Sequence, residues 1–431
     1  MNDLKGKRLL IVGGVNNLDD LILLAHRNGV FVGVTDYNKD TYLKELADAA
    51  YQVNALDVDA VVELCKTEKF DGVISNFVDM LLPYVTEISN KLGYNVPYTV
   101  DQLRLSTDKK YFKKKCLEYG VSVPKEYIID DINSISSEQF NFPVIVKPVD
   151  GSGSKGISVC NTIEELIIGY NNALENSISQ NVIVEDYIKG DEINVTYIVQ
   201  DGNVQLAAVH DRYFNTSQDV TVPVPDMYIY PSRYTSLCLN KYDSAIKNMI
   251  RGEGITNGSL FMQACVKDNV VYFYEAGMRL NGCKTYQILE VENNFNTLEY
   301  LMSYALGGSF GNNEQLSPNF KNWYATVNVL GIPGETISRF EGIEELLSYP
   351  WIISIARLYH EGDKIPEKAK GTLLQDTTRI HIVAGSKEQL IDRINIVNNL
   401  YKIYNENGEN IVLTPHDTIE LYNGLDYDLN N

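Results

Sequence analysis

Short apolar runs alternate with amphipathic stretches through the first hundred residues. Residues 8–12 and 30–35 are almost entirely apolar and predict buried strands, and residues 19–28 between them carry apolar side chains at helical spacing. A further apolar run at 72–75 predicts another strand. Strands separated by helices favour an open parallel sheet. The pattern therefore predicts a Rossmann-like α/β unit at the start of the chain.

Farther along the chain the predicted strands come in antiparallel pairs. A lysine-rich helix over 106–119 precedes the apolar run 143–148, which leads through a glycine-rich loop into another strand. Later, 260–267 and 270–276 are predicted to form a hairpin around a two-residue turn. This arrangement is typical of an α+β region. The predicted domains are an N-terminal unit over 1–98, a central domain over 99–312 and a C-terminal α+β domain over 313–431.

The composition narrows the class of partner. The chain has 431 residues, and its 57 acidic against 37 basic side chains give a formal net charge of −20. Most of such a surface repels a nucleic-acid backbone, so we expect small-molecule partners and no nucleic acid. No uncharged apolar run approaches the ~20 residues that cross a bilayer, so no membrane association is expected. The six cysteines lie far apart without paired spacing, which favours reduced thiols and a cytoplasmic location.

The glycine-rich loop at residues 151–156 is the first candidate for chemistry. Its glycines expose backbone N–H groups, and Lys155 adds a positive charge that suits a bound phosphate. A Walker loop is disfavoured because Gly156 and a strand follow the lysine, where that loop needs Ser or Thr and a helix. Taken alone, the segment is better explained as the mobile tip of a hairpin.

Three polar residues stand at or near the ends of predicted strands. Lys147 ends the strand that enters the loop, where its ammonium group can reach phosphates that the loop covers. Glu185 ends the apolar run 182–184, and Glu192 follows after a tight turn. One carboxylate can accept the adenine amino group and the other the ribose hydroxyls. Two solvated surface acids are the commoner explanation of such a pair.

The hairpin beyond these acids carries a candidate metal site. Gln263 on one strand is predicted to lie opposite Glu275 on the other, and side-chain oxygens from two strands suit Mg²⁺. By strand periodicity, Glu275 shares a face with Gly277, Arg279 and Asn281. Arg279 can meet a phosphoryl group or a substrate carboxylate with two parallel donors. An ion pair between Glu275 and Arg279 on an ordinary sheet face is the alternative.

Taken together and in this order, these segments resemble the ATP-grasp superfamily, in particular carboxylate-amine ligases similar to carbamoyl-phosphate synthetase halves and biotin carboxylase-like ligases. The matching segments are Thr107 to Lys109, Glu118 to Pro124, Phe142 to Pro148, Gly151 to Gly156, Glu185 to Glu192, and Gln263 with Glu275 and Arg279. The resemblance implies an ATP-grasp fold between a Rossmann-like pre-ATP-grasp domain and a C-terminal closing domain. A glycine-rich lid would lie within about 125–188.

Carried over residue by residue, the resemblance implies a role for each candidate. ATP and Mg²⁺ are the implied cofactors, with one or two ions and with Mn²⁺ as a possible substitute. Gln263 and Glu275 would bind the metal, and Arg279 and Lys147 would act in catalysis. The implied nucleotide contacts are Lys109 and Lys147 at the phosphates, Ser152, Gly153, Ser154, Lys155 and Gly156 in the lid, Glu185 and the backbone near Ile188 at adenine, and Glu192 at the ribose.

The implied reaction is the ADP-forming activation of a small carboxylate as an acyl phosphate, which an amine then attacks. Small carboxylates and amines would be the partners, and a homodimer is a possible assembly by analogy. No general base is evident in the sequence. His210 is a candidate for facing the substrate, with a packed or surface histidine as the alternative.

Two features leave other functions open. Relatives commonly carry Glu-x-Asn-x-Arg at the metal site, whereas this chain has Gly277 in place of the asparagine. Either water or Asn281 completes the shell, or one ion suffices, or catalysis is lost and the protein is a non-catalytic ATP-binding regulator. Gly13 and Gly14 after one strand and Asp36 after the next also imitate a dinucleotide fingerprint, which leaves an NAD-dependent oxidoreductase as the less favoured alternative.

Overall fold

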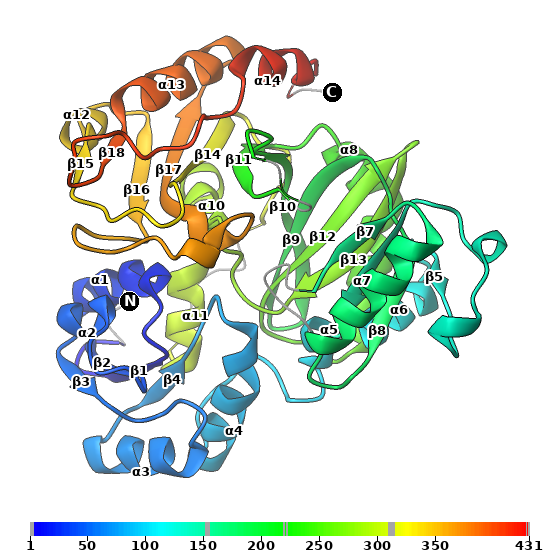
Figure 1. Ribbon diagram of the computed structural model, residues 1–431. Coiled ribbons are helices and arrows are strands. Elements are labelled where there is room, and N and C mark those ends of the chain that lie inside the picture. The colour runs from blue at the N-terminus through cyan, green and yellow to red at the C-terminus, as the bar shows by residue number, and fades with distance from the viewer. Residues whose placement is uncertain are drawn as a thin grey trace.

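The computed structural model describes residues 4–150, 156–218, 220, 223–308, 315–427 and 429. Its N-terminal part is a parallel sheet of four strands in the order β3-β2-β1-β4 (Figure 1). The strands are β1 (Arg8–Val12), β2 (Phe31–Thr35), β3 (Ala49–Tyr51) and β4 (Gly72–Ile74). The helices are α1 (Asp19–Arg27), α2 (Tyr42–Leu46), α3 (Val58–Glu68) and α4 (Leu82–Leu92). The predicted Rossmann-like arrangement of parallel strands and crossover helices is therefore present.

The turn after β1 is closed by Asp36, the acidic residue of the segment that imitates a dinucleotide fingerprint. Asp36 Oδ2 accepts a hydrogen bond from the backbone N–H of Gly14 at 2.8 Å, and its Oδ1 accepts one from Asn38 at 2.8 Å. A Cβ atom on Gly14 would lie 2.7 Å from the side chain of Thr41, so only glycine fits there. Asp36 in this structure therefore stabilises its own turn.

The lysine-rich helix predicted over 106–119 is divided in two. Asp108 adopts an extended conformation and separates α5 (Arg104–Thr107) from α6 (Lys109–Glu118). Its side chain accepts a hydrogen bond from the backbone N–H of Tyr111 at 3.0 Å, which caps the start of α6. Aspartate favours such N-cap positions over helix interiors, so the sequence signal was an N-cap. The break places Lys109 in the first turn of α6.

A small antiparallel sheet follows, in the order β5-β8-β6-β7. Its strands are β5 (Glu126–Tyr127), β6 (Val144–Pro148), β7 (Ser158–Cys160) and β8 (Val182–Asp186). The helix α7 (Ile163–Glu175) covers one face, where Leu166 and Ala173 pack against Val144 and Val146. The pairing of β6 with β7 confirms the predicted strand-loop-strand arrangement, although residues 151–155 of the loop lie outside the described part of the chain.

One eight-stranded antiparallel sheet spans the rest of the molecule, in the order β13-β12-β9-β10-β11-β14-β17-β16. Its strands are β9 (Asp191–Gln200), β10 (Asn203–Phe214), β11 (Pro225–Tyr230), β12 (Gly258–Lys267), β13 (Val270–Gly277), β14 (Trp323–Leu330), β16 (Ile352–Arg357) and β17 (Asp376–Ala384). The pairing of β11 with β14 carries the sheet across the predicted boundary at residue 312. The two predicted domains on either side of that boundary therefore share one sheet.

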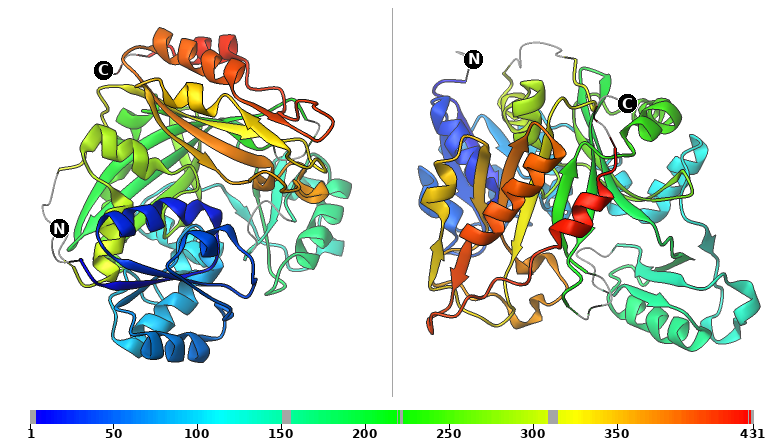
Figure 2. Two further views of the ribbon diagram at one scale, coloured as in Figure 1. Left: turned by 90° about the vertical axis from the view of Figure 1, so that its left-hand side faces the viewer. Right: turned by 90° about the horizontal axis from the view of Figure 1, so that it is seen from above.

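The remaining helices cover this sheet and connect it to the N-terminal part. They are α8 (Thr235–Leu237), α9 (Asp243–Gly252), α10 (Thr285–Asn293), α11 (Thr297–Ala305), α12 (Ile343–Leu347), α13 (Lys387–Leu400) and α14 (Thr418–Gly424). A two-stranded sheet pairs β15 (Arg339–Glu341) with β18 (Lys402–Tyr404). Figure 2 shows α13 and α14 above the C-terminal strands, with which they share a hydrophobic core. Along the described chain, none of the helices combines the length and apolar character that crossing a bilayer requires.

A buried ion cluster joins the N-terminal part to α10. Lys284 is fully buried, and its ammonium group lies 3.1 Å from Asp19 Oδ1 and 3.1 Å from Asp20 Oδ2. Asp20 Oδ2 also accepts a hydrogen bond from the Tyr286 hydroxyl at 2.6 Å. Both aspartates lie in the first turn of α1. The cluster therefore fixes the N-terminal sheet against the segment that follows β13.

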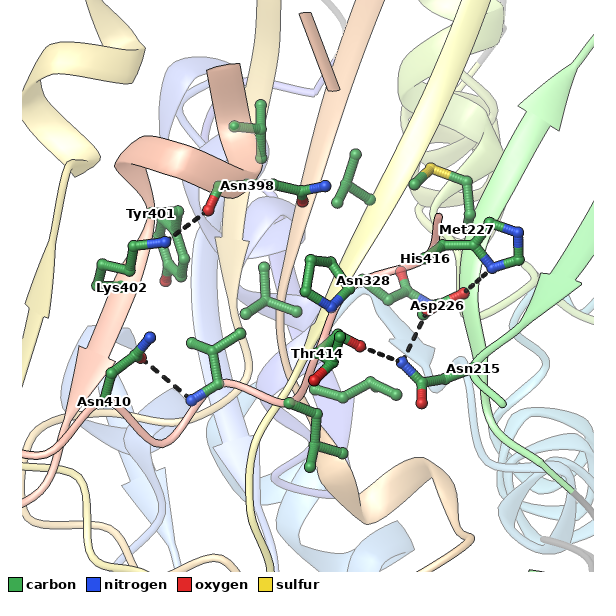
Figure 3. Close-up of a pocket in the computed structure, with 17 residues that line it drawn as sticks. Asn215, Asp226, Met227, Asn328, Asn398, Tyr401, Lys402, Asn410, Thr414 and His416 are labelled. Carbon is green, nitrogen blue, oxygen red and sulfur yellow. Dashed lines mark hydrogen bonds and ion pairs between the residues drawn. The ribbon is translucent and has the colours of Figure 1, made fainter. Parts of the chain in front are cut away.

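A pocket of about 260 Å³ lies between β11, β14, the end of α13 and the segment 410–416 (Figure 3). Asn215 Nδ2 donates hydrogen bonds to Asp226 Oδ2 at 2.9 Å and to the carbonyl oxygen of Thr414 at 2.8 Å. His416 Nδ1 lies 3.5 Å from Asp226 Oδ1. The hydrogen bond to Asp226 raises the pKa of His416 above its usual value. These contacts hold the C-terminal segment against β11.

Candidate nucleotide and metal site

A cleft of about 430 Å³ lies between the small sheet and one end of the eight-stranded sheet. The N-terminal part contributes Asp79 to its lining, and the loop before β17 contributes Gly371 to Leu373. Its charged and polar lining residues are Asp79, Lys109, Lys147, Glu185, Asp186, Tyr187, Lys189, Glu192, Arg212, Gln263, Cys265, Tyr274, Glu275, Arg279 and Thr372. The cleft therefore gathers every described residue that the sequence predicted for phosphate, ribose, adenine and metal, apart from Gly156.

Glu185 forms the centre of a buried ion cluster at one wall of the cleft. It is 1% exposed and accepts hydrogen bonds from the ammonium groups of Lys147 and of Lys113, the latter at 2.7 Å. Lys113 also lies 3.1 Å from Glu126. Burial raises the pKa of Glu185, but the two lysines outweigh it and hold the pKa below its usual range. Glu185 is therefore ionised and already paired. The pair with Lys113 was not predicted, because the lysines of a charged helix usually face solvent.

The turn between β8 and β9 brings backbone groups to the cleft. Ile188 lines the cleft, and its carbonyl oxygen accepts a hydrogen bond from Cys265 Sγ at 3.2 Å. A Cβ atom on Gly190 would lie 2.1 Å from the carbonyl oxygen of Val266, so the turn packs directly on β12. The backbone at Ile188 is thus held in place at the cleft wall, where an adenine ring would need fixed donors and acceptors.

Glu192 lies in a second polar cluster, on the floor of the cleft. Its Oε2 accepts hydrogen bonds from Arg212 Nη1 at 3.3 Å and from the Tyr274 hydroxyl at 2.5 Å. Arg212 Nη1 also donates to Gln263 Oε1 at 3.3 Å. Burial raises the pKa of Glu192, and Arg212 opposes that rise. Neither Arg212 nor Tyr274 was predicted as a site residue. Arg212 could have been found from its position, because it pairs with Glu192 on the adjacent strand.

The predicted metal ligands lie side by side. Gln263 on β12 pairs directly with Glu275 on β13, as the hairpin predicted. Glu275 Oε1 lies 3.4 Å from the ammonium group of Lys109. Burial raises the pKa of Glu275, but the positive charges of Lys109, Lys147 and Arg279 lower it by more. The pKa of Glu275 therefore lies below its usual value. An ionised carboxylate surrounded by three cations is suited to a metal ion that carries phosphate groups.

Arg279 is held by the N-terminal part of the chain. Its Nε and Nη2 atoms lie 2.8 Å and 2.6 Å from Asp79 Oδ2, and its Nη1 donates to the carbonyl oxygen of Leu280 at 2.9 Å. The guanidinium also lies over the ring of Phe261, 5.1 Å from its centroid. Arg279 therefore pairs with Asp79, whereas the alternative interpretation of the sequence had paired it with Glu275, and the pair with Asp79 fixes the direction in which the guanidinium points.

Two residues near this site differ from expectation. Strand β13 ends at Gly277, so Asn281 leaves the predicted face and instead exchanges hydrogen bonds with Thr285, at 3.1 Å and 2.7 Å. His210 is fully buried, with Nε2 3.7 Å from Cys283 Sγ. Burial lowers the pKa of His210 well below its usual value. Asn281 is therefore engaged elsewhere, and His210 is a neutral core residue.

Gly156 is the one described residue of the glycine-rich loop 151–156. Gly156 has a φ of +71°, and a Cβ atom there would lie 2.8 Å from Asn176 and 2.9 Å from Pro148. Both its conformation and its packing therefore require glycine. The other predicted lid contacts, Ser152, Gly153, Ser154 and Lys155, lie outside the described residues.

Part of the chain matches a known domain family in sequence. The ATP-grasp domain family matches residues 140–287. A carbamoyl phosphate synthase large chain from Methanocorpusculum labreanum is 31% identical over 153 residues, which are 34% of this chain but only 14% of that protein. A formate-dependent phosphoribosylglycinamide formyltransferase from Geobacter metallireducens is 23% identical over 405 residues, covering 90% of this chain and 97% of that protein.

Solved structures extend the likeness to the whole fold. Phosphoribosylglycinamide synthetase from Anaerococcus prevotii superposes with a TM-score of 0.72 at 20% identity, over 93% of this chain and 100% of that one. The biotin carboxylase domain of Hydrogenobacter thermophilus 2-oxoglutarate carboxylase, solved with MgADP and bicarbonate, gives 0.77 at 16% identity, over 94% and 91%. Residues 140–287 therefore match the ATP-grasp domain family, within a chain that has the fold of these solved structures along nearly its whole length.

Proposed function

We propose that the protein is an ATP-dependent ligase that activates a small carboxylate as an acyl phosphate and joins it to an amine, releasing ADP and phosphate. The observation that carries the proposal is the ionised Glu275 between Lys109, Lys147 and Arg279 at one end of a cleft. Three cations and one metal-binding carboxylate match the charge of a γ-phosphoryl group in transfer. The ATP-grasp domain and the named relatives support the same reaction class.

The described contacts support a division of the cleft into parts. Lys109 and Lys147 would hold the phosphates, and the loop 151–156 would cover them. Glu185 and the backbone near Ile188 would bind adenine, and Glu192 would bind the ribose. Glu185 needs no new counter-charge when Lys147 turns toward a phosphate, because Lys113 still neutralises it.

The donor set at the metal position fits a hard cation in part. Glu275 offers an ionised carboxylate, but Gln263 Oε1 accepts a hydrogen bond from Arg212 Nη1 at 3.3 Å. The Tyr274 hydroxyl also lies 3.3 Å from Gln263 Oε1, but it donates its single proton to Glu192 at 2.5 Å. A bound Mg²⁺ would neutralise phosphate oxygens and orient the γ-phosphoryl group. Gln263 would bind it only by releasing Arg212. The proposal includes one or two divalent ions, with Mn²⁺ able to replace Mg²⁺. It also includes a cytoplasmic location and a homodimeric assembly.

The direct test is phosphate and ADP release from Mg-ATP across pooled amino acids and other small carboxylates, each with and without pooled amines. Substrate-dependent release, with mass spectrometry to identify the joined product, is the expected result. Lys147→Ala should abolish release, whereas Lys114→Ala, which alters an exposed lysine on α6, should leave it unchanged.

A non-catalytic ATP-binding regulator is the second candidate, and Gly277 favours it. A Cβ atom at this position would lie 2.3 Å from the ring of Phe261, so no asparagine can stand there in this structure. Tight ATP binding by calorimetry together with no ADP release from any pool would favour the regulator over the ligase.

A further inference from the structure

Position 277 at the predicted metal site is a glycine, and another side chain fills the space that a side chain at 277 would need. Phe261 pairs with Gly277 across β12 and β13, and its ring occupies the space that a side chain at 277 would need. The ring also lies under the guanidinium of Arg279, which holds it there. Any protein oxygen that takes the place of this ligand would therefore come from another strand.

Asn194 on β9 stands beside Gln263. The register pairs Gln263 with Glu275 on one side and with Asn194 on the other, and directly paired residues project from the same face of a sheet. Glu275, Gln263 and Asn194 thus form a row across three neighbouring strands. Glu192, two residues before Asn194 on the same strand, lines the cleft from the same face.

The side-chain oxygen of Asn194 has no protein partner among the described residues. Asn194 is 4% exposed, and its Oδ1 atom accepts no hydrogen bond. Leaving a buried acceptor unsatisfied costs about 1–3 kcal/mol, so such an atom calls for an explanation. The neighbouring Gln263 oxygen already accepts a hydrogen bond from Arg212, whereas the Asn194 oxygen accepts none from the described residues. Amide oxygens are among the ligands that Mg²⁺ and Mn²⁺ accept.

We propose that Asn194 Oδ1 replaces the missing asparagine as an oxygen ligand for the divalent ion beside Glu275. The inference rests on the proposed function, because it assumes a metal-nucleotide complex in the cleft. It assigns to β9 a contact that the usual Glu-x-Asn arrangement places on β13.

Metal binding can be measured without turnover. Mn²⁺ is titrated into the protein saturated with ADP, and free Mn²⁺ is read by electron paramagnetic resonance. Asn194→Ala should bind Mn²⁺ at least tenfold more weakly than the wild type, and Asn194→Asp should bind it at least as tightly. Asn328→Ala is the matched control, because Asn328 is also 4% exposed, its Oδ1 has no partner among the described residues, and it stands on β14 in the pocket of Figure 3.

A rescue variant separates lost ligation from lost packing. Phe261→Ala with Gly277→Asn opens the position and returns the usual ligand, so adding both changes to Asn194→Ala should restore Mn²⁺ affinity. Wild-type affinity in Asn194→Ala would overturn the inference while leaving the ligase proposal intact. If Asn194→Ala does not fold, weaker binding in Asn194→Asp than in the wild type overturns it instead. Absence of any Mn²⁺-ADP binding by the wild type would overturn the metal-nucleotide site itself.

Discussion

Replacing Lys113 by methionine removes one of the two ammonium groups that face Glu185. Methionine keeps much of the length and apolar bulk of the lysine stem, so the main change is the lost charge. Removing one partner of a buried ion pair costs about 3–5 kcal/mol of folding free energy. Because Lys147 still pairs with Glu185, we expect the lower end, about 3 kcal/mol.

The loss should depend on pH in a defined direction. The folded pKa of Glu185 lies below its usual value, so its pairing contributes stability above the unfolded pKa and loses it as the pH falls through the folded pKa. In the Lys113→Met variant, Glu185 takes a proton at a higher pH and escapes the penalty of an underpaired charge. The difference from the wild type should therefore be largest near pH 7 and shrink toward about pH 4.

Urea unfolding followed by circular dichroism at both pH values measures the effect. Lys114→Met is the matched control, because the side chain of Lys114 is 70% exposed and makes a surface pair with Glu118 that is worth less than about 0.5 kcal/mol. Equal unfolding midpoints for the two variants at pH 7 would refute the buried-cluster argument. So would a deficit in Lys113→Met that grows as the pH falls.

Three further changes test other parts of the structure. Gly277→Ala should destabilise the protein by about 1–3 kcal/mol in thermal unfolding because its methyl group meets the ring of Phe261, and Phe261→Leu should recover part of the loss; an additive double variant would contradict the clash. Lys284→Met should cost about 3 kcal/mol and speed proteolysis of the N-terminal part, since it leaves two partly buried aspartates of α1 without their buried cation; unchanged proteolysis would argue against this anchor. His416→Gln should be less stable than the wild type below about pH 6.5, with the gap closing as the pH rises through the raised pKa of His416; a gap that widens at high pH would reject the Asp226 pair as its source.

Local signals in the sequence were sufficient for the elements but not for how far the sheets extend. The parallel N-terminal strands and the hairpin of β12 and β13 follow from apolar periodicity and a two-residue turn, both of which act within about ten residues. The pairing of β11 with β14 joins strands almost a hundred residues apart, and nothing in either strand names its partner. The break in the helix at Asp108 was readable, because aspartate three residues before Tyr111 is an N-cap pattern.

The same distinction holds in the cleft. Lys147, Glu185 and Gln263 could be located because each follows or lies within an apolar run, so its strand was predictable. Lys113 and Asp79 could not, since their partners depend on how α6 and the N-terminal part pack against the cleft. Sequence periodicity gives the face on which a residue lies; the opposing surface is a property of the tertiary structure.

The sheet that runs unbroken from β13 to β16 has a mechanical consequence. Rigid-body motion between its two halves would break the backbone hydrogen bonds between β11 and β14. The C-terminal part therefore cannot move away from the cleft as a separate rigid body. Within the described residues, the small sheet of β5 to β8 forms no ladder with the large one, so it can rock as a unit over the cleft. Nucleotide entry and exit would then be gated from one side, and the rate of ADP departure would report the motion of that sheet.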